Sequence, residues 1–184
     1  MKNSVLNISV KKIDGQTTTL EPFKGKVLLI VNVASKCGLT PQYTQLESLY
    51  QEKRGRGLEI LAFPANNFMG QEPGTDAEIM SFCSTNYDVH FPLFGKISVK
   101  GPDQHPLYGL LTGLRPDAVG AAPMRERLAG HGIKDDGAAG DILWNFEKFL
   151  VARDGSVAER FAPDVTPDDP RLAAAIDREL ARAG

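Results

Sequence analysis

The sequence predicts an α/β fold in which a central mixed β-sheet is flanked by helices. Two apolar runs, 27–34 and 58–63, each precede a segment with helical features, so the strands they form should be parallel. A tight turn joins two further strand-like segments, 145–152 and 156–162, which adds an antiparallel pair to the same sheet. A helix is expected near the end of the chain.

The first predicted strand, Val27–Ala34, is a run of β-branched and aliphatic residues that is typical of a strand covered on both faces. Thr40 and Pro41 then suit the N-cap and the first position of a helix. Leu46 to Tyr50 supply an apolar face, and Gly55 ends the helical pattern.

The second predicted strand, Leu58–Phe63, ends at Pro64. Thr75–Glu78 has the pattern of a capping box, in which a threonine and a glutamate three residues later satisfy each other's backbone N–H groups. A helix that carries Ile79 and Cys83 should therefore begin here.

Between 107 and 140 the sequence pattern is weak, whereas the hairpin and the helix that follow are clearly indicated. Leu107–Leu114 predicts a short helix, and 115–140 predicts an irregular or partly helical insertion rich in Gly, Ala, Pro and charge. Asp154-Gly155 predicts the turn of the hairpin. Thr166–Asp169 should cap a final amphipathic helix that runs through Leu180.

This order of strands, helices, hairpin and last helix is that of a thioredoxin-like fold. The sequence contains no repeat and no linker-like segment, and its 184 residues fit one domain. We therefore expect a single thioredoxin-like domain over 1–184.

Charge and hydropathy exclude several functional classes. A formal net charge of -2 gives no electrostatic basis for binding nucleic acid or an anionic membrane. The only basic cluster, Lys53, Arg54 and Arg56, is interpreted as the solvated end of a helix. No run approaches the roughly 20 apolar residues of a membrane span, and 1–14 lacks the apolar core of a secretory signal. A cytoplasmic protein without membrane insertion is expected.

Two cysteines, Cys37 and Cys83, are too few for a disulfide scaffold, and with three scattered histidines they form no zinc-type spacing. We expect no bound metal and no cofactor. Each cysteine is then either a buried core thiol or a reactive one.

Cys37 is predicted between the carboxyl end of a buried strand and the start of a helix, where reactive groups collect in open α/β sheets. A helix N-terminus favours the thiolate, which is the nucleophile that splits a peroxide O–O bond to give a sulfenic acid. Position alone leaves the reactive and the buried interpretations open. Thr40 occupies the place of the second cysteine of a local dithiol, so classical disulfide exchange is disfavoured.

Three segments resemble the signatures of glutathione peroxidases. Val31-Asn-Val-Ala-Ser-Lys-Cys-Gly-Leu-Thr40 is similar to the active-site signature in its cysteine form, where other members carry selenocysteine. Phe63-Pro-Ala-Asn-Asn-Phe-Met-Gly-Gln-Glu-Pro-Gly74 and Asp141-Ile-Leu-Trp-Asn-Phe-Glu-Lys-Phe-Leu150 resemble the second and third. The resemblance runs from about Ile13 to the C-terminal helix, in one order.

The resemblance implies that Cys37 is the peroxidatic residue and that Gln71, Trp144 and Asn145 complete a catalytic tetrad. Their amide and indole N–H groups are donors able to stabilise a thiolate and a developing oxyanion. By themselves these residues would be interpreted as a surface glutamine, a core tryptophan and a turn asparagine. Ala65 stands where the second signature commonly has a cysteine, so turnover here does not need that thiol.

Cys83 matches the position of the resolving cysteine in members that use thioredoxin. That resemblance implies a Cys37–Cys83 disulfide, which suits a dithiol reductant. The helix around Cys83 would have to loosen for the two thiols to meet, because a disulfide requires Cα atoms within about 7 Å. The alternative is a core thiol that packs with Ile79 and Phe82.

The expected function is reduction of hydrogen peroxide and organic hydroperoxides, with thioredoxin as the expected reductant and glutathione as the alternative. Arg115, Arg125 and Arg127 are either contacts for glutathione carboxylates or solvated charge. Phe68, Phe91 and Trp144 are either an apolar rim that admits organic hydroperoxides or core residues. A peroxide sensor that passes a disulfide to a partner protein remains the alternative function. The oligomeric state is left open.

Overall fold

The computed structural model describes residues 4–135 and 137–183. Residues 1–3 and 184, at the ends of the expected single domain, lie outside the described residues, as does position 136 in the predicted insertion.

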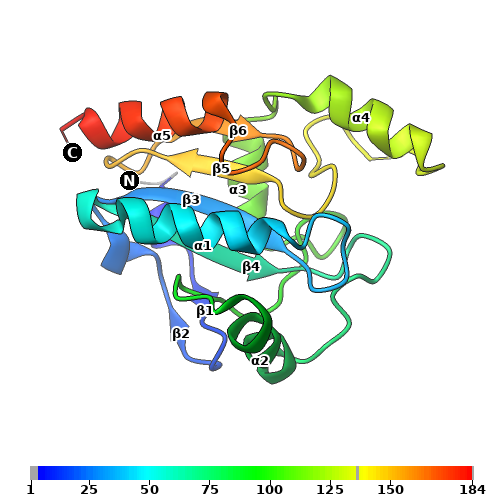
Figure 1. Cartoon of the computed structure of the whole chain (residues 1–184), viewed down its shortest axis with the longest axis horizontal. Helices are drawn as coiled ribbons and strands as arrows, with labels where there is room; N and C mark the ends of the chain where they lie inside the picture. The colour runs from blue at the N-terminus through cyan, green and yellow to red at the C-terminus, as the bar shows by residue number, and fades with distance from the viewer. Residues whose placement is uncertain (1–3, 136, 184) are drawn as a thin grey trace.

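A four-stranded mixed sheet forms the centre of the molecule, with its strands in the order β4-β3-β5-β6 (Figure 1). These strands are β3 (Val27–Val33), β4 (Leu58–Pro64), β5 (Lys148–Val151) and β6 (Val157–Phe161). β3 pairs in parallel with β4 and antiparallel with β5, and β5 pairs antiparallel with β6. The predicted α/β fold with a mixed sheet and an antiparallel hairpin is confirmed.

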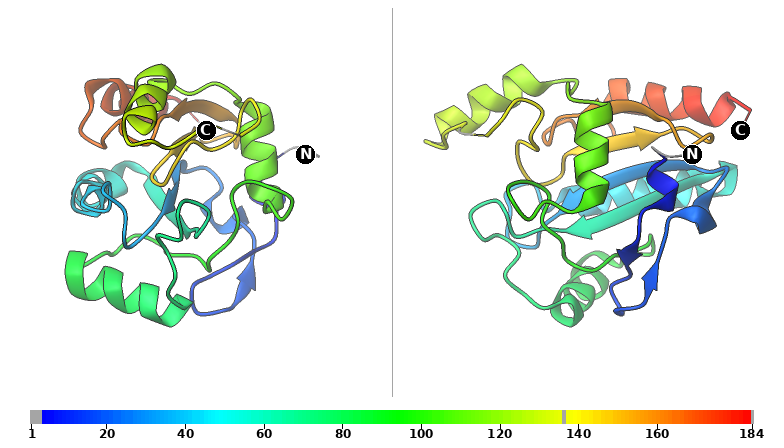
Figure 2. Two further views of the ribbon diagram at one scale, coloured as in Figure 1. Left: turned by 90° about the vertical axis from the view of Figure 1, so that its right-hand side faces the viewer. Right: turned by 180° about the vertical axis from the view of Figure 1, so that it is seen from behind.

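Helices cover both faces of this sheet. α1 (Gln42–Lys53) and α5 (Pro170–Ala181) lie on one face, and α3 (Pro106–Leu114) lies on the opposite face (Figure 2). α2 (Asp76–Tyr87) lies beyond the β4 edge next to α1, and α4 (Ala121–Gly130) projects at the end where β3 and β4 finish (Figure 1). The short elements are η1 (Val5–Asn7), β1 (Val10–Lys11), β2 (Thr17–Thr18), η2 (Glu21–Phe23) and η3 (Arg54–Arg56).

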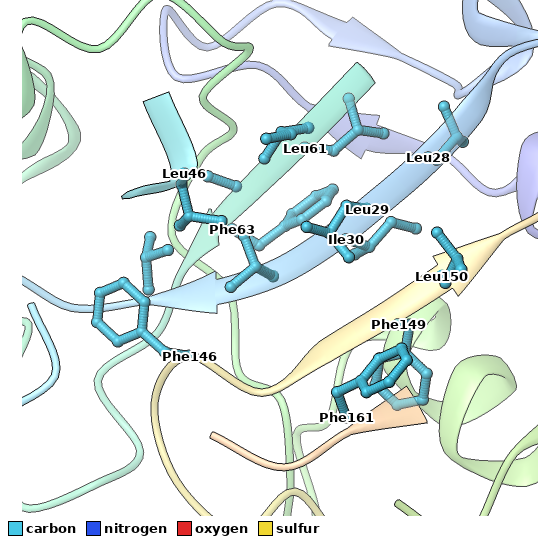
Figure 3. Packing of buried hydrophobic residues seen from close by; sticks show 14 of the residues in the cluster. Leu28, Leu29, Ile30, Leu46, Leu61, Phe63, Phe146, Phe149, Leu150 and Phe161 are labelled. Carbon is cyan, nitrogen blue, oxygen red and sulfur yellow. The ribbon is translucent and has the colours of Figure 1, made fainter. Parts of the chain in front are cut away.

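The core forms on both sides of β3, all seven residues of which are buried. Leu28, Leu29 and Ile30 of this strand pack among Phe63 of β4 and Phe149 of β5 (Figure 3). A strand without an exposed face has no reason to alternate apolar and polar residues, which explains its continuous apolar run.

The first residues of two elements differ from those predicted. α1 begins at Gln42 with Pro41 at the N-cap position, and Thr40 does not cap it with its side chain. β5 begins at Lys148 because Phe146 adopts a φ of 69°, which turns the chain before the strand. The insertion is partly helical, as expected, and contains α4.

The basic cluster at the end of α1 is not simply solvated. Lys53 is buried, and its Nζ lies 2.5 Å from Oδ1 of Asp177 on α5. Arg56 contacts the same carboxylate at 3.2 Å. The cluster therefore joins α1 to α5 by ion pairs.

Arg160 of β6 fastens both ends of the insertion to the sheet. Its guanidinium is buried and donates to the carbonyl oxygens of Arg115 and Pro116 at one end and of Gly140 and Asp141 at the other. It also pairs with the buried Glu147. The two ends of the insertion that contains α4 are therefore held together at Arg160.

None of the helices in the described residues combines the length and apolar character needed to cross a bilayer.

Candidate active site

Cys37 lies in the tight turn between β3 and α1, and Thr40 organises that turn. The Cys37 N–H donates to Thr40 Oγ1 at 3.0 Å, and this hydroxyl donates to the Ala34 carbonyl at 2.7 Å. The Leu39 N–H points at Cys37 Sγ from 3.3 Å. A hydrogen bond to the charged form favours a thiolate. The donor belongs to this turn and not, as predicted, to the first turn of α1.

The loop after β4 brings Gln71 beside this turn. The Lys36 N–H donates to the Gln71 carbonyl at 3.0 Å, and the Gln71 N–H donates to the Phe68 carbonyl at 3.2 Å. Met69 and Gly70 adopt positive φ values of 55° and 62°, which fold the loop back. The Gln71 backbone is therefore tied directly to the turn that carries Cys37.

The loop before β5 supplies Trp144 and Asn145, and Asn32 of β3 anchors it. Asn32 Nδ2 donates to the Trp144 carbonyl at 3.2 Å, and the Phe146 N–H donates to the Asn32 carbonyl at 2.6 Å. Asn145 is buried, and its Nδ2 donates to Gln71 Oε1 at 2.9 Å. The amide of Gln71 is thereby oriented by that of Asn145.

Cys37, Gln71 and Trp144 line one cavity of about 730 Å³, whereas Asn145 and Cys83 are not among its lining residues. Cys37 is 9% exposed and Trp144 is 8% exposed, so both side chains are almost entirely buried. Two neutral N–H donors and a thiol thus face a common space, which is the arrangement that could bind and split a peroxide.

Phe68 also lines this cavity, and its ring centroid lies 5.2 Å from that of Trp144. Phe91, the third member of the predicted apolar rim, does not belong to the rim. It is buried in the core against Tyr43 and Tyr50.

The insertion forms the opposite wall of the cavity. Met124, Leu128 and Ile133 contribute apolar side chains, and Arg127 lies among them. Of the other two arginines considered as glutathione contacts, Arg125 is paired with Asp135 and Arg115 bonds to the Ala158 carbonyl. Neither of these two lines the cavity.

Cys83 lies on the buried side of α2, and both cysteines are free thiols. Burial raises the pKa of the Cys83 thiol to about 11. The Tyr43 hydroxyl lies beside it, and burial raises the pKa of that phenol too. In this arrangement Cys83 is a protonated thiol at neutral pH.

Three buried polar residues around the site escaped the sequence interpretation. Asn32 is a polar residue inside an apolar strand, and this interruption was the available signal. The sequence around Glu72 and Lys148 gave no such signal. Both side chains are buried only because of how the folded chain packs around them.

Comparisons with known proteins show to which family the chain belongs. A family model described as glutathione peroxidase matches residues 5–112. The chain is 51% identical over 185 residues to an Escherichia coli protein named thioredoxin/glutathione peroxidase BtuE, covering 99% of this chain and all of the relative.

The chain belongs to the glutathione peroxidase family. It is therefore a peroxidase, an oxidoreductase that reduces peroxides. A Synechocystis member named hydroperoxy fatty acid reductase is 45% identical over 97% of this chain and 96% of its own length.

Solved structures agree with membership of the glutathione peroxidase family. The crystal structure of T. cruzi GPX1 superposes with a TM-score of 0.70 at 31% identity, covering 96% of each chain. A thioredoxin-family thiol:disulfide interchange protein from Chlorobium tepidum matches with a TM-score of 0.60 at 14% identity, covering 97% of this chain and 96% of its own. The predicted thioredoxin-like fold is confirmed.

Proposed function

We propose that this glutathione peroxidase family member reduces hydrogen peroxide and organic hydroperoxides with Cys37 as the peroxidatic residue. The observation that carries the proposal is the shared cavity of Cys37, Gln71 and Trp144, with Gln71 held by Asn145. The Cys37 thiolate attacks one peroxide oxygen and the O–O bond breaks. This step yields a sulfenic acid on Cys37 and water or an alcohol.

Leu39, together with Gln71, Trp144 and Asn145, prepares this step. The Leu39 N–H supports the negative charge on Sγ in the resting enzyme. The amide of Gln71 and the indole of Trp144 donate to the peroxide and to the leaving oxygen as its charge develops. Asn145 acts through Gln71, whose carbonyl oxygen it holds so that the N–H side of the amide remains available for the cavity.

Cys83 is the resolving cysteine in this proposal. Its thiol attacks the sulfenic acid, a Cys37–Cys83 disulfide forms and water leaves. Because Cys83 is fully buried on α2 and does not line the cavity, α2 opens locally for the sulfurs to meet. Unchanged hydrogen exchange in α2 after oxidation would contradict this movement.

Thioredoxin is the proposed reductant, because an intramolecular disulfide is the natural target of a dithiol. Glutathione is the alternative, and the name of the Escherichia coli relative includes both.

The whole chain acts as one cytoplasmic peroxidase domain that needs no metal or cofactor. No group of three or more His, Cys, Asp or Glu side chains in the described ranges is placed to hold a metal ion.

Peroxide-dependent NADPH oxidation tests the reductant. One assay contains thioredoxin and its reductase, the other glutathione and its reductase. We expect turnover with thioredoxin, its loss in Cys37→Ser and in Cys83→Ser, and normal turnover in the control Ser84→Ala, which changes an exposed neighbour on α2.

The other outcomes are equally informative. Turnover with glutathione alone, unaffected by Cys83→Ser, would make Cys83 structural. Rapid oxidation of Cys37 without turnover in either assay would replace the enzyme proposal with that of a peroxide sensor that passes its disulfide to a partner protein.

A further inference from the structure

Lys148 is a buried lysine that the steps above do not use. It is the first residue of β5, and its side chain is fully buried. Its Nζ donates to the carbonyl oxygens of Phe146 at 2.6 Å and of Pro163 at 2.9 Å. Lysine is rarely fully buried, because removing an ammonium from water costs free energy. A lysine in this position therefore calls for an explanation beyond packing.

The Phe146 carbonyl directly follows the catalytic pair Trp144 and Asn145 in the chain. Phe146 adopts a φ of 69°, a conformation that residues other than glycine keep only where neighbouring groups hold them. Its N–H donates to the Asn32 carbonyl at 2.6 Å, and its carbonyl accepts from Lys148. Both polar groups of this residue are therefore held, which fixes the path of the chain from Trp144 and Asn145 into β5.

The Pro163 carbonyl, which follows β6, connects Lys148 to the other half of the site. The same oxygen accepts from Gln42 Nε2 at 2.8 Å. Gln42 is the buried first residue of α1, and its N–H donates to the Leu39 carbonyl at 2.9 Å in the turn that carries Cys37. Lys148, the Pro163 carbonyl and Gln42 thus form a continuous hydrogen-bonded bridge between the loop before β5 and the Cys37 turn.

Backbone pairing between β3 and β5 does not by itself fix the spacing of these two halves. Val31 and Lys148 form the final pair of the antiparallel register on the side of the site. Beyond this pair β3 continues toward Cys37, whereas the chain before β5 turns at Phe146. Cys37 and Trp144 nevertheless line the same cavity. A misplacement of reacting groups by about 1 Å can cost on the order of 100-fold in rate, so their separation must be set by other contacts.

We propose that Lys148 is a positioning residue for the peroxide step, an inference that rests on the proposed role of Cys37. Through the carbonyls of Phe146 and Pro163, its Nζ holds the loop of Trp144 and Asn145 at a defined distance from the Cys37 turn. Lys148 is not among the residues that line the cavity, so it acts through these groups and does not touch the peroxide.

Lys148→Met tests the proposal, because the side chain keeps a similar volume and loses its N–H donors. Quenched-flow mass spectrometry of the full chain, with hydrogen peroxide as the probe, follows sulfenic acid and disulfide formation separately. We expect the rate constant of Cys37 oxidation to fall at least about tenfold. The later disulfide step, which does not need Trp144, should stay within about twofold of wild type. Lys24→Met replaces an exposed lysine and should change neither step.

Trp144 fluorescence supplies a readout that a merely structural role would not change. Trp144 is the only tryptophan of the chain, and its 8% exposure limits contact with acrylamide. In reduced Lys148→Met we expect quenching by acrylamide to rise roughly twofold, because a loop released at Phe146 exposes the indole more often. The urea midpoint at pH 7 should stay close to that of wild type, since replacing a buried charge with an apolar side chain is often nearly neutral.

Gln42→Leu tests the bridge from its other end and keeps Lys148, so it also decides the question if Lys148→Met does not fold. We expect slower Cys37 oxidation in Gln42→Leu and a normal rate in Gln51→Leu, which changes an exposed amide of the same helix. The double variant should be slowed by less than the product of the two single factors, because both act through one carbonyl. A normal rate in Gln42→Leu, or a double variant slowed by the full product, would overturn the bridge.

Failure of this proposal is distinguishable from failure of the proposed function. A wild-type protein whose Cys37 is not oxidised by hydrogen peroxide would overturn both. Oxidation of Cys37 at equal rates in wild type and Lys148→Met would overturn only the role of Lys148. Slower oxidation with unchanged quenching of Trp144 would also overturn it, since the loop would not have moved.

Discussion

At the scale of single residues, the site depends on side chains that hold other groups in position. Thr40 closes the Cys37 turn, Asn32 anchors the carbonyl of Trp144, and Asn145 orients Gln71. Each is buried and bonded to an atom close to the cavity. Small errors in the placement of reacting groups are costly, so these residues should matter for rate although not all of them touch the peroxide.

Asn145→Ala is expected to lower kcat/KM for hydrogen peroxide by about 10- to 100-fold, because the amide of Gln71 loses the donor that orients it. Single-turnover oxidation of Cys37 measures this directly. Gln51→Ala is the control, since Gln51 is an exposed amide that donates to Glu47 on the same helix. Equal rates for Asn145→Ala and wild type would refute the orienting role.

At the scale of elements, α2 combines a complete N-terminal cap with few buried residues. The predicted capping box is present, with Glu78 N donating to Thr75 Oγ1 at 3.2 Å and Thr75 N to Glu78 Oε1 at 2.9 Å. Yet α2 buries only Ile79 and Cys83 of its 12 residues. Few buried apolar contacts give low local stability, which the proposed movement of Cys83 requires.

Removing the cap should therefore change kinetics as well as stability. Thr75→Ala weakens α2 by about 1 kcal/mol, so the open form becomes roughly fivefold more populated and Cys37–Cys83 disulfide formation accelerates by a similar factor. Asp169→Ala removes the cap of α5 at comparable cost and should leave that rate unchanged. Quenched-flow mass spectrometry measures both, and a slower disulfide step in Thr75→Ala would contradict local opening.

At the scale of the whole molecule, buried charges join distant segments. Lys148 of β5 is fully buried, and its Nζ donates to the carbonyls of Phe146 at 2.6 Å and Pro163 at 2.9 Å. Gln42 of α1 donates to the same Pro163 carbonyl at 2.8 Å. These bonds connect the loop of Trp144, the end of β6 and the start of α1.

This lysine should make stability depend on pH. Burial lowers the pKa of Lys148 to about 7, against 10.5 for an ordinary lysine. Between these values the unfolded chain binds more protons than the folded one, so the free energy of unfolding rises with pH across this window. Below about pH 7 the folded protein carries the full cost of the buried ammonium.

We expect the stability of the wild type relative to Lys148→Met to increase by about 2 kcal/mol from pH 7 to pH 9. Urea denaturation at several pH values measures it, with the exposed Lys12→Met as control. A relative stability that does not change between pH 7 and pH 9 would show that Lys148 remains charged in the folded protein.

Patterns that depend on near neighbours were predictable. The apolar run of β3, the capping box of α2 and the Asp154-Gly155 hairpin were confirmed because each reflects local geometry or burial on both faces. The cluster at Lys53 was misjudged, because its partner Asp177 lies 124 residues away. The sequence left Phe91 open between rim and core, since an aromatic residue suits both, and only the packed structure places it in the core.

The sequence by itself determined the family, the order of strands and helices, and the residues proposed for catalysis, because long motifs and local periodicity survive without coordinates. Only the tertiary structure decided that Asn145 reaches the cavity through Gln71, that α4 forms its opposite wall, and that Glu72 accepts the Ser35 N–H beside the Cys37 turn. The physical reason is that burial and hydrogen bonding between remote segments arise only when the chain packs. A pattern of neighbouring residues does not show which distant residues will meet.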